Sequence, residues 1–474
     1  MISRKEEKGS ITIFLSFVVL LLISIIAQVL QEAIFQADRI KAASAIDLSL
    51  NAVLGEYNKE LLENYGLIFL ESSDSEGNFQ KADVLSRIDY YFYKNIEEQS
   101  EMLRMEIGDE ALKERRFVTD QEGQGFYEDV IKAYKTRIPA KLAEEAMKMA
   151  ADYEKAKESR KTLEEKKIDP KELEVPKNIE VDEEAKKKAE DVVNPVEVIN
   201  LLKTNPLLTI LAGDLSISNN AIDLNTTLQK RNLNKGNYNP DSKTGISDKV
   251  IFDLYLNQEF KSFVNYIEIT DKQDKLLYEK EYIISGKASD VENLTDVVEK
   301  IIWIREGINF VYLLSDQTKL AEAEVLATAL IGYTGQPPLI FAMKMAILAV
   351  WAYGESLIET RILLHGGKVD FLKNAENWKL TLTNLKNIQE LLKGTYMGDA
   401  QGMSYEDYLI IFIGVTSKTD KCFRSMDIIE RNIQFLTGVK TFKMDNCLVD
   451  IGVEISVISR GGRMITVKKV MGYW

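Results

Sequence analysis

The residue types that most often perform chemistry in proteins are scarce in this chain of 474 residues. Its one histidine, His365, stands beside a glycine pair, and no Gly-x-Ser-x-Gly nucleophile signature lies near it. A Ser-His-Asp or Cys-His catalytic unit would have to use this imidazole. We predict instead that His365 ends a helix and interacts with the exposed carbonyl groups there. The sequence therefore predicts no catalytic residue and favours a protein that is not an enzyme.

The two cysteines, Cys422 and Cys447, do not have the spacing of metal ligands. They could form one disulfide if they face an oxidising exterior, and the alternative is two unpaired, small apolar side chains. Residues 239–243 resemble a calcium loop, but Lys243 stands where an oxygen ligand is needed and no glutamate closes the loop. We therefore predict no metal site and no cofactor.

Charged residues make up 28% of the chain, and the net charge is −14. A nucleic-acid-binding protein needs a basic face to neutralise phosphates, so nucleic acid is excluded as a partner. Among 74 Asp and Glu residues, no pair has the pattern of a two-carboxylate hydrolase. The most informative charges are Lys344, Glu355 and Arg361, within a strongly apolar segment. We predict that these three form a buried charge network rather than an active site.

The N-terminal segment carries an uncharged apolar run over residues 11–30, which reads ITIFLSFVVLLLISIIAQVL. Twenty helical residues rise about 30 Å, the thickness of the hydrocarbon layer of a bilayer. We predict a transmembrane helix over residues 10–31, with the lipid bilayer as a partner. The alternatives are a buried core helix, a secretory signal cleaved near residues 43–45, and a pilin-like leader that ends at Gly9-Ser10.

Basic residues near the N-terminus indicate the orientation of this helix. Arg4, Lys5 and Lys8 precede the apolar run, and cytoplasmic flanks carry an excess of such residues. We therefore predict a single-pass protein of the cell membrane, with residues 1–9 in the cytoplasm (or forming a leader) and the bulk of the chain outside the cell.

Beyond the apolar run, apolar residues recur at spacings of three and four, which predicts a stalk helix over residues 32–66. The stripe comprises Ala43, Ile46, Leu50, Val53, Tyr57 and Leu61. Gly66 can take the left-handed conformation that ends a helix. The stripe must pack on the protein's own head domain or on neighbouring subunits, and we favour the head domain.

The middle of the chain is predicted as a series of segments with different compositions. Residues 66–70 form a short strand, and residues 67–152 are mainly helical, with helices over 82–105 and 125–167. Lys and Glu dominate residues 153–195, which predicts an exposed helix and a linker broken by Pro170 and Pro176, or alternatively a charged docking segment. Residues 196–247 form a loop-rich connector.

The last predicted unit is a head domain over residues 248–474. Ser289 and Glu292 form a capping box that opens a helix to about residue 314. Only residues 345–354 of the apolar helix over 339–364 are uncharged, which is too short for a second membrane span. Further elements are a strand over residues 275–285, helices over 317–331 and 403–434, and a β-hairpin over 448–470 that turns at Gly461-Gly462. The predicted fold class is α+β, mainly α, with a small antiparallel sheet.

Several of these stretches together resemble one family. They read KGSITIFLSFVVLLL at residues 8–22, AIDLSLNAVLGEYNKELLENYGLIFL at 45–70, and YEKEYIISGKASDVENLTDVVEKIIWIREGINFVYLLSD at 278–316, with further likeness at 337–382 and 402–412. The chain resembles an uncharacterised family of single-pass membrane proteins encoded with tight-adherence (Tad/Flp-type) pilus assembly genes of Gram-positive bacteria.

This resemblance implies a pilin-like or pseudopilin-like accessory component of a Tad-type pilus or secretion apparatus, with other pilus-assembly membrane proteins as partners. It also implies that Gly9-Ser10 is a candidate prepilin-peptidase junction, although Phe14 stands where pilins place a glutamate. The alternative function is a surface adhesin or ligand sensor that binds through residues 219–247. A membrane-tethered hydrolase is the least favoured hypothesis.

Overall fold

The computed structural model describes residues 6–97, 105–166, 183–239, 245–265, 275–394, 398–399, 401–459 and 461–473. The chain forms two compact units. Unit 1 consists of Met1–Asp129, Leu233–Ser242 and Thr437–Trp474, and unit 2 of Val130–Asn232 and Lys243–Leu436. The predicted head domain over residues 248–474 is therefore divided, because the C-terminal hairpin belongs to the unit that contains the N-terminal helix. The predicted fold class, mainly helical α+β with a small antiparallel sheet, is confirmed.

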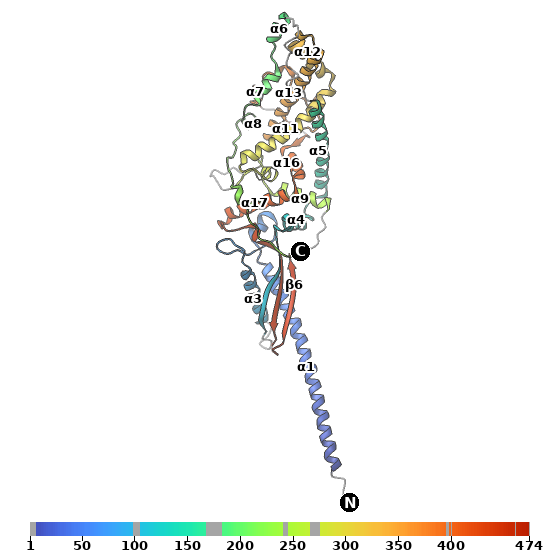
Figure 1. The fold of residues 1–474 in the computed structure, drawn as a ribbon, viewed down its shortest axis with the longest axis vertical. Helices are drawn as coiled ribbons and strands as arrows, with labels where there is room; N and C mark the ends of the chain where they lie inside the picture. Colours follow the sequence, from blue (N-terminus) through green and yellow to red (C-terminus); the bar gives the residue numbers. More distant parts are fainter. Residues whose placement is uncertain are drawn as a thin grey trace. The chain divides into compact units, whose positions relative to one another are not determined.

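The N-terminal helix α1 (Glu6–Leu54) joins the predicted transmembrane helix and most of the predicted stalk in one uninterrupted element of 49 residues (Figure 1). It does not reach residue 66 as predicted. The Asn58 side chain accepts a hydrogen bond from the backbone N–H of Leu61 and starts a separate helix, α2 (Lys59–Tyr65). Gly66 ends α2 at φ 66°, as the sequence predicted. The predicted stalk helix is therefore divided, because Asn58 caps the start of a new helix before the chain reaches Gly66.

The two halves of α1 have different surroundings. None of its most apolar window is buried within the protein, and the helix is long and apolar enough to cross a membrane. In the second half, Ala42, Ile46, Leu50 and Val53 are completely buried in the core of unit 1. The predicted stripe thus packs on the protein's own domain, with Ala42 in the place predicted for Ala43.

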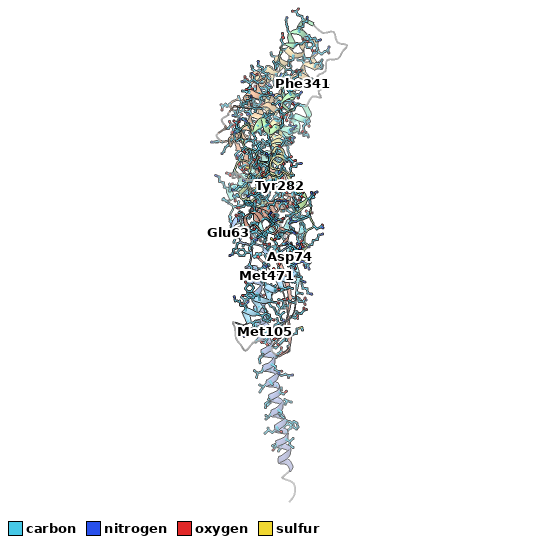
Figure 2. The ribbon with its side chains drawn as sticks, turned by 90° about the vertical axis from the view of Figure 1, so that its left-hand side faces the viewer. Glu63, Asp74, Met105, Tyr282, Phe341 and Met471 are labelled. Carbon is cyan, nitrogen blue, oxygen red and sulfur yellow. The ribbon has the colours of Figure 1, made fainter. Side chains whose placement is uncertain are left out.

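Unit 1 contains a four-stranded antiparallel sheet, and α1 and α3 (Lys81–Glu97) supply the apolar side chains that pack on it. The central strand β5 (Cys447–Ile458) pairs with β1 (Leu70–Glu71), β2 (Glu106–Phe117) and β6 (Met464–Gly472). The predicted C-terminal hairpin is confirmed, and Gly462 takes φ 74° in its turn. Figure 2 labels Met105, directly before β2, at the end of unit 1 where α1 emerges.

Two strands of this unit differ from the sequence prediction. The predicted strand over residues 66–70 is reduced to β1, and β2 lies inside the segment predicted to be helical. The predicted helix over 82–105 is α3, which ends before β2 begins. A further helix, α4 (Asp120–Tyr134), begins in unit 1 and continues into unit 2.

Within the described residues, unit 2 is mainly helical and contains one short pair of strands, β3 (Lys368–Val369) and β4 (Met403–Ser404). Its helices are α5 (Ala140–Lys166), α6 (Glu183–Glu190), α7 (Pro195–Leu202), α8 (Leu207–Leu211), α9 (Ile246–Glu259), α10 (Glu279–Ser285), α11 (Asp290–Ser315), α12 (Gln317–Ile331), α13 (Pro337–Leu364), α14 (Leu382–Leu385), α15 (Ile388–Leu391), α16 (Tyr405–Val415) and α17 (Lys418–Thr437). The capping box of Ser289 and Glu292 opens α11 as predicted.

The centre of unit 2 is the pair of long helices α11 and α13. Although α13 is long and apolar enough to cross a membrane, half of its most apolar window is buried within the protein. Its charged residues Glu355, Glu359 and Arg361 are buried there as well. The prediction of a core helix at this position is therefore confirmed.

The sequence prediction failed in the segments that flank this core. Residues 275–285, predicted as a strand, contain α10, which ends at Gly286 with φ 66°. The predicted loop-rich connector contains α7, α8 and the start of α9. The exposed charged helix is observed as α5. The linker prolines Pro170 and Pro176 lie outside the described residues.

Candidate functional site

A buried charge network lies between α11, α13 and the segment that follows β3. Arg305 donates to both carboxylate oxygens of Glu359, at 2.6 and 2.9 Å, and both side chains are fully buried. Lys373 lies 2.7 Å from a carboxylate oxygen of Glu355 and 2.8 Å from one of Glu359. Two cations and two carboxylates therefore balance one another in the core, as a buried ion cluster requires.

The same network fixes the backbone of the segment after β3. Glu355 accepts hydrogen bonds from the backbone N–H groups of Lys379 and Leu380, at 2.9 and 2.7 Å. Arg305 donates to the carbonyl groups of Asp370 and Phe371. The cluster is thus saturated by the protein itself, which indicates a structural role.

Only Glu355 of the three predicted network residues lies in this cluster. Lys344 pairs with the exposed Glu324 at 2.9 Å. Arg361 is buried, and its guanidinium donates to the carbonyl groups of Gly394 and Leu211 at 3.1 and 2.8 Å. The two residues are on the predicted helix, but they project toward other neighbours.

The other predicted site residues are placed as follows. His365 is the C-cap of α13, and burial lowers its pKa, with Arg361 adding to the effect. Cys422 and Cys447 are both buried thiols, in unit 2 and unit 1 respectively. The backbone of Gly9 and Ser10 is part of α1. Within the residues that the structure describes, no group of three His, Cys, Asp or Glu side chains is arranged to hold a metal ion.

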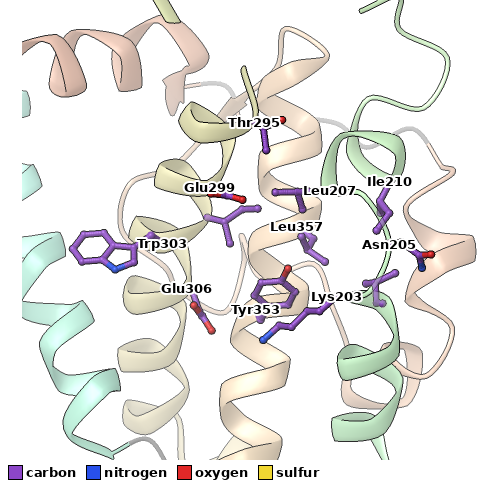
Figure 3. Close-up of a pocket in the computed structure, with 12 residues that line it drawn as sticks. Lys203, Asn205, Leu207, Ile210, Thr295, Glu299, Trp303, Glu306, Tyr353 and Leu357 are labelled. Carbon is purple, nitrogen blue, oxygen red and sulfur yellow. The ribbon is translucent and has the colours of Figure 1, made fainter. Parts of the chain in front are cut away.

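A cleft of about 380 Å³ opens on unit 2 between α11, α13 and the α7–α8 connection (Figure 3). One wall carries Glu299 and Glu306 of α11, and the opposite wall carries Lys203, at the end of α7. Leu357 and Tyr353 of α13 line the cleft between these walls. In Figure 3 the Lys203 and Tyr353 side chains point toward each other, and the Trp303 ring points away from Tyr353.

Charges and aromatic rings are paired around this cleft. The Lys203 ammonium lies 4.3 Å from the centroid of the Tyr353 ring, a cation–π geometry. Burial raises the pKa of Tyr353 to about 12, and Glu306 and Glu299 add to the effect, so its hydroxyl stays protonated. Arg160 of α5 forms an ion pair with Glu306. Glu299 is exposed at the cleft wall.

These cleft residues were not predicted from the sequence. A signal was present, since Glu299, Trp303 and Glu306 follow one another at spacings of four and three and therefore share one face of α11. The partners Lys203 and Tyr353 are far from α11 in sequence, so only the tertiary structure brings the cleft together.

A second and wider groove, of about 1000 Å³, runs beside α12. Apolar side chains such as Val325 and Leu326 line much of it, and Val193 lies at its edge. Its lining contains charged residues, among them Asp191, Glu322 and Lys386, but no aromatic residue. The smaller cleft has the more specific chemistry and is the better candidate site.

Comparisons with known proteins give one match. Residues 183–459 match the model of a family of unknown function, DUF5702. No curated protein and no solved structure matched the chain. The matched residues include α11, α13, the buried charge network and the cleft, and they make up more than half of the chain. The protein therefore belongs to the DUF5702 family.

Proposed function

We propose that this protein is a membrane-anchored structural component, not an enzyme, of a Tad/Flp-like pilus or related secretion apparatus. Its N-terminus lies in the cytoplasm, α1 spans the cell membrane, and the bulk of the chain is displayed outside the cell to interact with other pilus-assembly proteins. One observation carries the anchoring role. A single helix is apolar and exposed in its first half and is packed in a domain core in its second half.

The structure explains how such an anchor would act. Because α1 passes without a break from its apolar half into the core of unit 1, a force on unit 1 is transmitted along a rigid helix. This is the connection expected of a pilin-like N-terminus. The pilus assignment itself rests on the resemblance of the stretches quoted above, and the candidate junction at Gly9-Ser10 belongs to it.

Two charges placed in the apolar half of α1 should release the protein from the membrane. Each acidic residue at the centre of a membrane helix costs about 2.5–3.5 kcal/mol, so Leu20→Asp combined with Ile23→Asp should move the full chain from the membrane pellet to the supernatant. The same double variant should fail to restore surface pili or secretion in a strain from which the gene is deleted.

The matched control is Ile40→Asp combined with Leu48→Asp, because these residues are exposed on the second half of the same helix. This variant should stay in the membrane pellet and restore function. Deletion of the gene with no change in pili, secretion or adhesion would contradict the pilus proposal. Mass spectrometry of the mature N-terminus distinguishes cleavage before Ser10 from an intact anchor.

The cleft on unit 2 favours a second candidate function, in which the protein is a surface adhesin or ligand sensor. The loop over residues 219–247 was the predicted binding region, but part of it is held by the fold. The backbone N–H of Gly236 donates to Asp120, and Asn234 donates to Asn446 at 2.7 Å. The cleft is the better-formed site, and the exposed carboxylate of Glu299 in its wall suits the protonated amine of a wall polymer.

We expect glucosamine oligomers to bind the full-length protein saturably and N-acetylglucosamine oligomers, which lack the charge, to bind more weakly. Loss of a charged hydrogen bond costs about 1.5–3 kcal/mol, so Glu299→Gln should weaken glucosamine binding by at least about tenfold in calorimetric titrations. Glu324→Gln, an exposed carboxylate outside the cleft lining, is the control and should bind normally. Equal binding of both sugars would contradict this recognition. A hydrolase is less favoured because the Glu306 carboxylate is already engaged by Arg160 in an ion pair.

A further inference from the structure

The end of unit 1 from which α1 emerges is built from three elements. The tip of the β5–β6 hairpin lies there, and Ile458 in β5 pairs with Glu106 at the start of β2. The last turns of α3 are adjacent, because the Tyr93 hydroxyl accepts a hydrogen bond from the backbone N–H of Ile107 at 3.2 Å. The tip of the hairpin, the start of β2 and the end of α3 therefore form one surface, which we call the basal surface (Figure 1).

The hairpin tip is fixed to α1 where the apolar run of the helix ends. Arg463 donates to Glu32 at 3.0 Å, and its guanidinium lies 3.5 Å from the centroid of the Phe35 ring. Glu32 is two residues beyond the apolar run, which corresponds to about 3 Å along the helix axis. If residues 11–30 occupy the hydrocarbon layer, the hairpin tip must lie at the level of the lipid headgroups.

The side chains exposed on the basal surface suit that environment. Met464 is 63% exposed and Ile458 is 37% exposed at the hairpin tip. On α3, Tyr90 is 61% exposed and Tyr93 is 39% exposed. The Lys94 ammonium lies 5.9 Å from the centroid of the Tyr90 ring. Tyrosine rings and basic side chains gather at membrane–water interfaces, where an apolar body and a polar tip are both solvated.

We propose that the basal surface is a second membrane contact, which inserts the hairpin tip and the tyrosines of α3 into the headgroup layer beside α1. The partner is the lipid surface itself, because the tip is tied to α1 at the interface level. This inference rests on the proposed membrane span of α1 and adds a contact outside that span. Two contacts with one bilayer would fix the tilt of unit 1, which a single helix leaves free.

Spin labels on the full-length protein test the proposal in vesicles of equal parts phosphatidylcholine and phosphatidylglycerol. Variants with one added cysteine place the label at the hairpin tip (Met464→Cys), on the same strand about 20 Å away (Val470→Cys) and in the middle of the apolar run (Leu20→Cys). The native thiols are buried, and the parent chain measures their background labelling. The readout is the accessibility of each label to oxygen, which concentrates in lipid, relative to a water-soluble nickel complex.

The label at position 464 should show an oxygen-to-nickel ratio several-fold higher than the label at position 470, and the label at position 20 the highest ratio. A lipid-like signal at position 20 with equal, water-like signals at 464 and 470 would overturn the second contact and leave the anchor intact. A water-like signal at position 20 would overturn the membrane span, and with it this inference.

Discussion

Replacement of Arg305 by methionine should lower the free energy of unfolding of unit 2 by about 3–5 kcal/mol, because it leaves a buried carboxylate without its main partner. Arg305 and Glu359 are fully buried and joined by two hydrogen bonds. Burial alone would raise the pKa of Glu359, but the charges of Arg305 and Lys373 lower it to about 2. The carboxylate is therefore ionised at neutral pH, and the variant must bury that charge with less compensation.

Tryptophan fluorescence during urea unfolding of the full chain in detergent measures this loss. Trp303, Trp351 and Trp378 all lie in unit 2, so the signal reports mainly on that unit. Lys344→Met is the control, because the partner of Lys344 is 61% exposed and such ion pairs contribute at most about 1 kcal/mol. Equal stabilities of the two variants would show that the buried pair does not hold unit 2 together.

A second change distinguishes the charge from the shape of the side chain. Arg305→Met leaves Lys373 to balance both Glu355 and Glu359, and a further Glu359→Met change removes the excess negative charge. Replacing buried ion pairs by apolar residues of similar volume often costs little stability. The double variant should therefore be more stable than Arg305→Met alone. A further loss would mean that packing around Arg305, not its charge, dominates.

The parts of this fold that could be predicted are those with strong local signals. The capping box at Ser289 and Glu292 and the periodic apolar residues after it define α11 almost to the residue. The apolar run of α13 and the glycine turn of the C-terminal hairpin are local signals of the same kind. In each case the residues that specify the element lie within it.

The elements that could not be predicted depend on distant partners. Strand β2 has the sequence EIGDEALKERRF, which is rich in helix-forming residues, and it becomes a strand by pairing with β5 from the other end of the chain. Helix α10 has the β-branched and aromatic residues of a strand, but Glu279, Lys280 and Glu281 are all buried within it. Tertiary burial of both faces overrides the local propensity.

The same limit applies to the candidate sites. Charges within an apolar helix indicated a buried network around Glu355, and one exists. Glu359 lies four residues from Glu355 on the same helix, but Arg305 comes from α11 and Lys373 from the segment after β3, so sequence separation hides these two members. Lys344 and Arg361 were assigned to the network only because they share a helix with Glu355. The cleft depends in the same way on the approach of α7 to α11.

Glu281→Gln should remove a pH-dependent loss of stability from unit 2. Burial raises the pKa of Glu281 to about 7, and hydrogen bonds from the Phe263 backbone and the Tyr405 hydroxyl counteract it only in part. A carboxyl group with a raised pKa in the folded state stabilises the fold below its unfolded pKa of about 4.5, and this stability is lost as the pH rises through 7. Each pH unit between these two pKa values corresponds to about 1.4 kcal/mol, so the free energy of unfolding falls by about 3 kcal/mol over this range.

The variant should therefore match the parent protein near pH 4.5 and exceed its stability by about 3 kcal/mol at pH 8, in the same fluorescence-detected unfolding experiment. Asp427, whose pKa burial also raises to about 7, contributes to the pH dependence of both proteins, so the difference between them isolates Glu281. Parallel stability curves for the two proteins between pH 4.5 and 8 would contradict the prediction.

Glu279→Gln on the same short helix is the matched control. Both carboxylates are buried, but they differ in how many of their oxygens accept hydrogen bonds. One oxygen of Glu281 has no hydrogen-bond partner among the described residues, whereas both oxygens of Glu279 accept bonds, from the Lys261 backbone at 2.8 Å and from Asn432 at 2.6 Å. In the variant, the amide nitrogen of the new glutamine faces one of these donors in place of an oxygen. The free energy of unfolding should therefore fall by about 1–3 kcal/mol even at pH 5. Glu281→Gln should lose nothing there, since its amide nitrogen takes the place of an oxygen that accepts no bond.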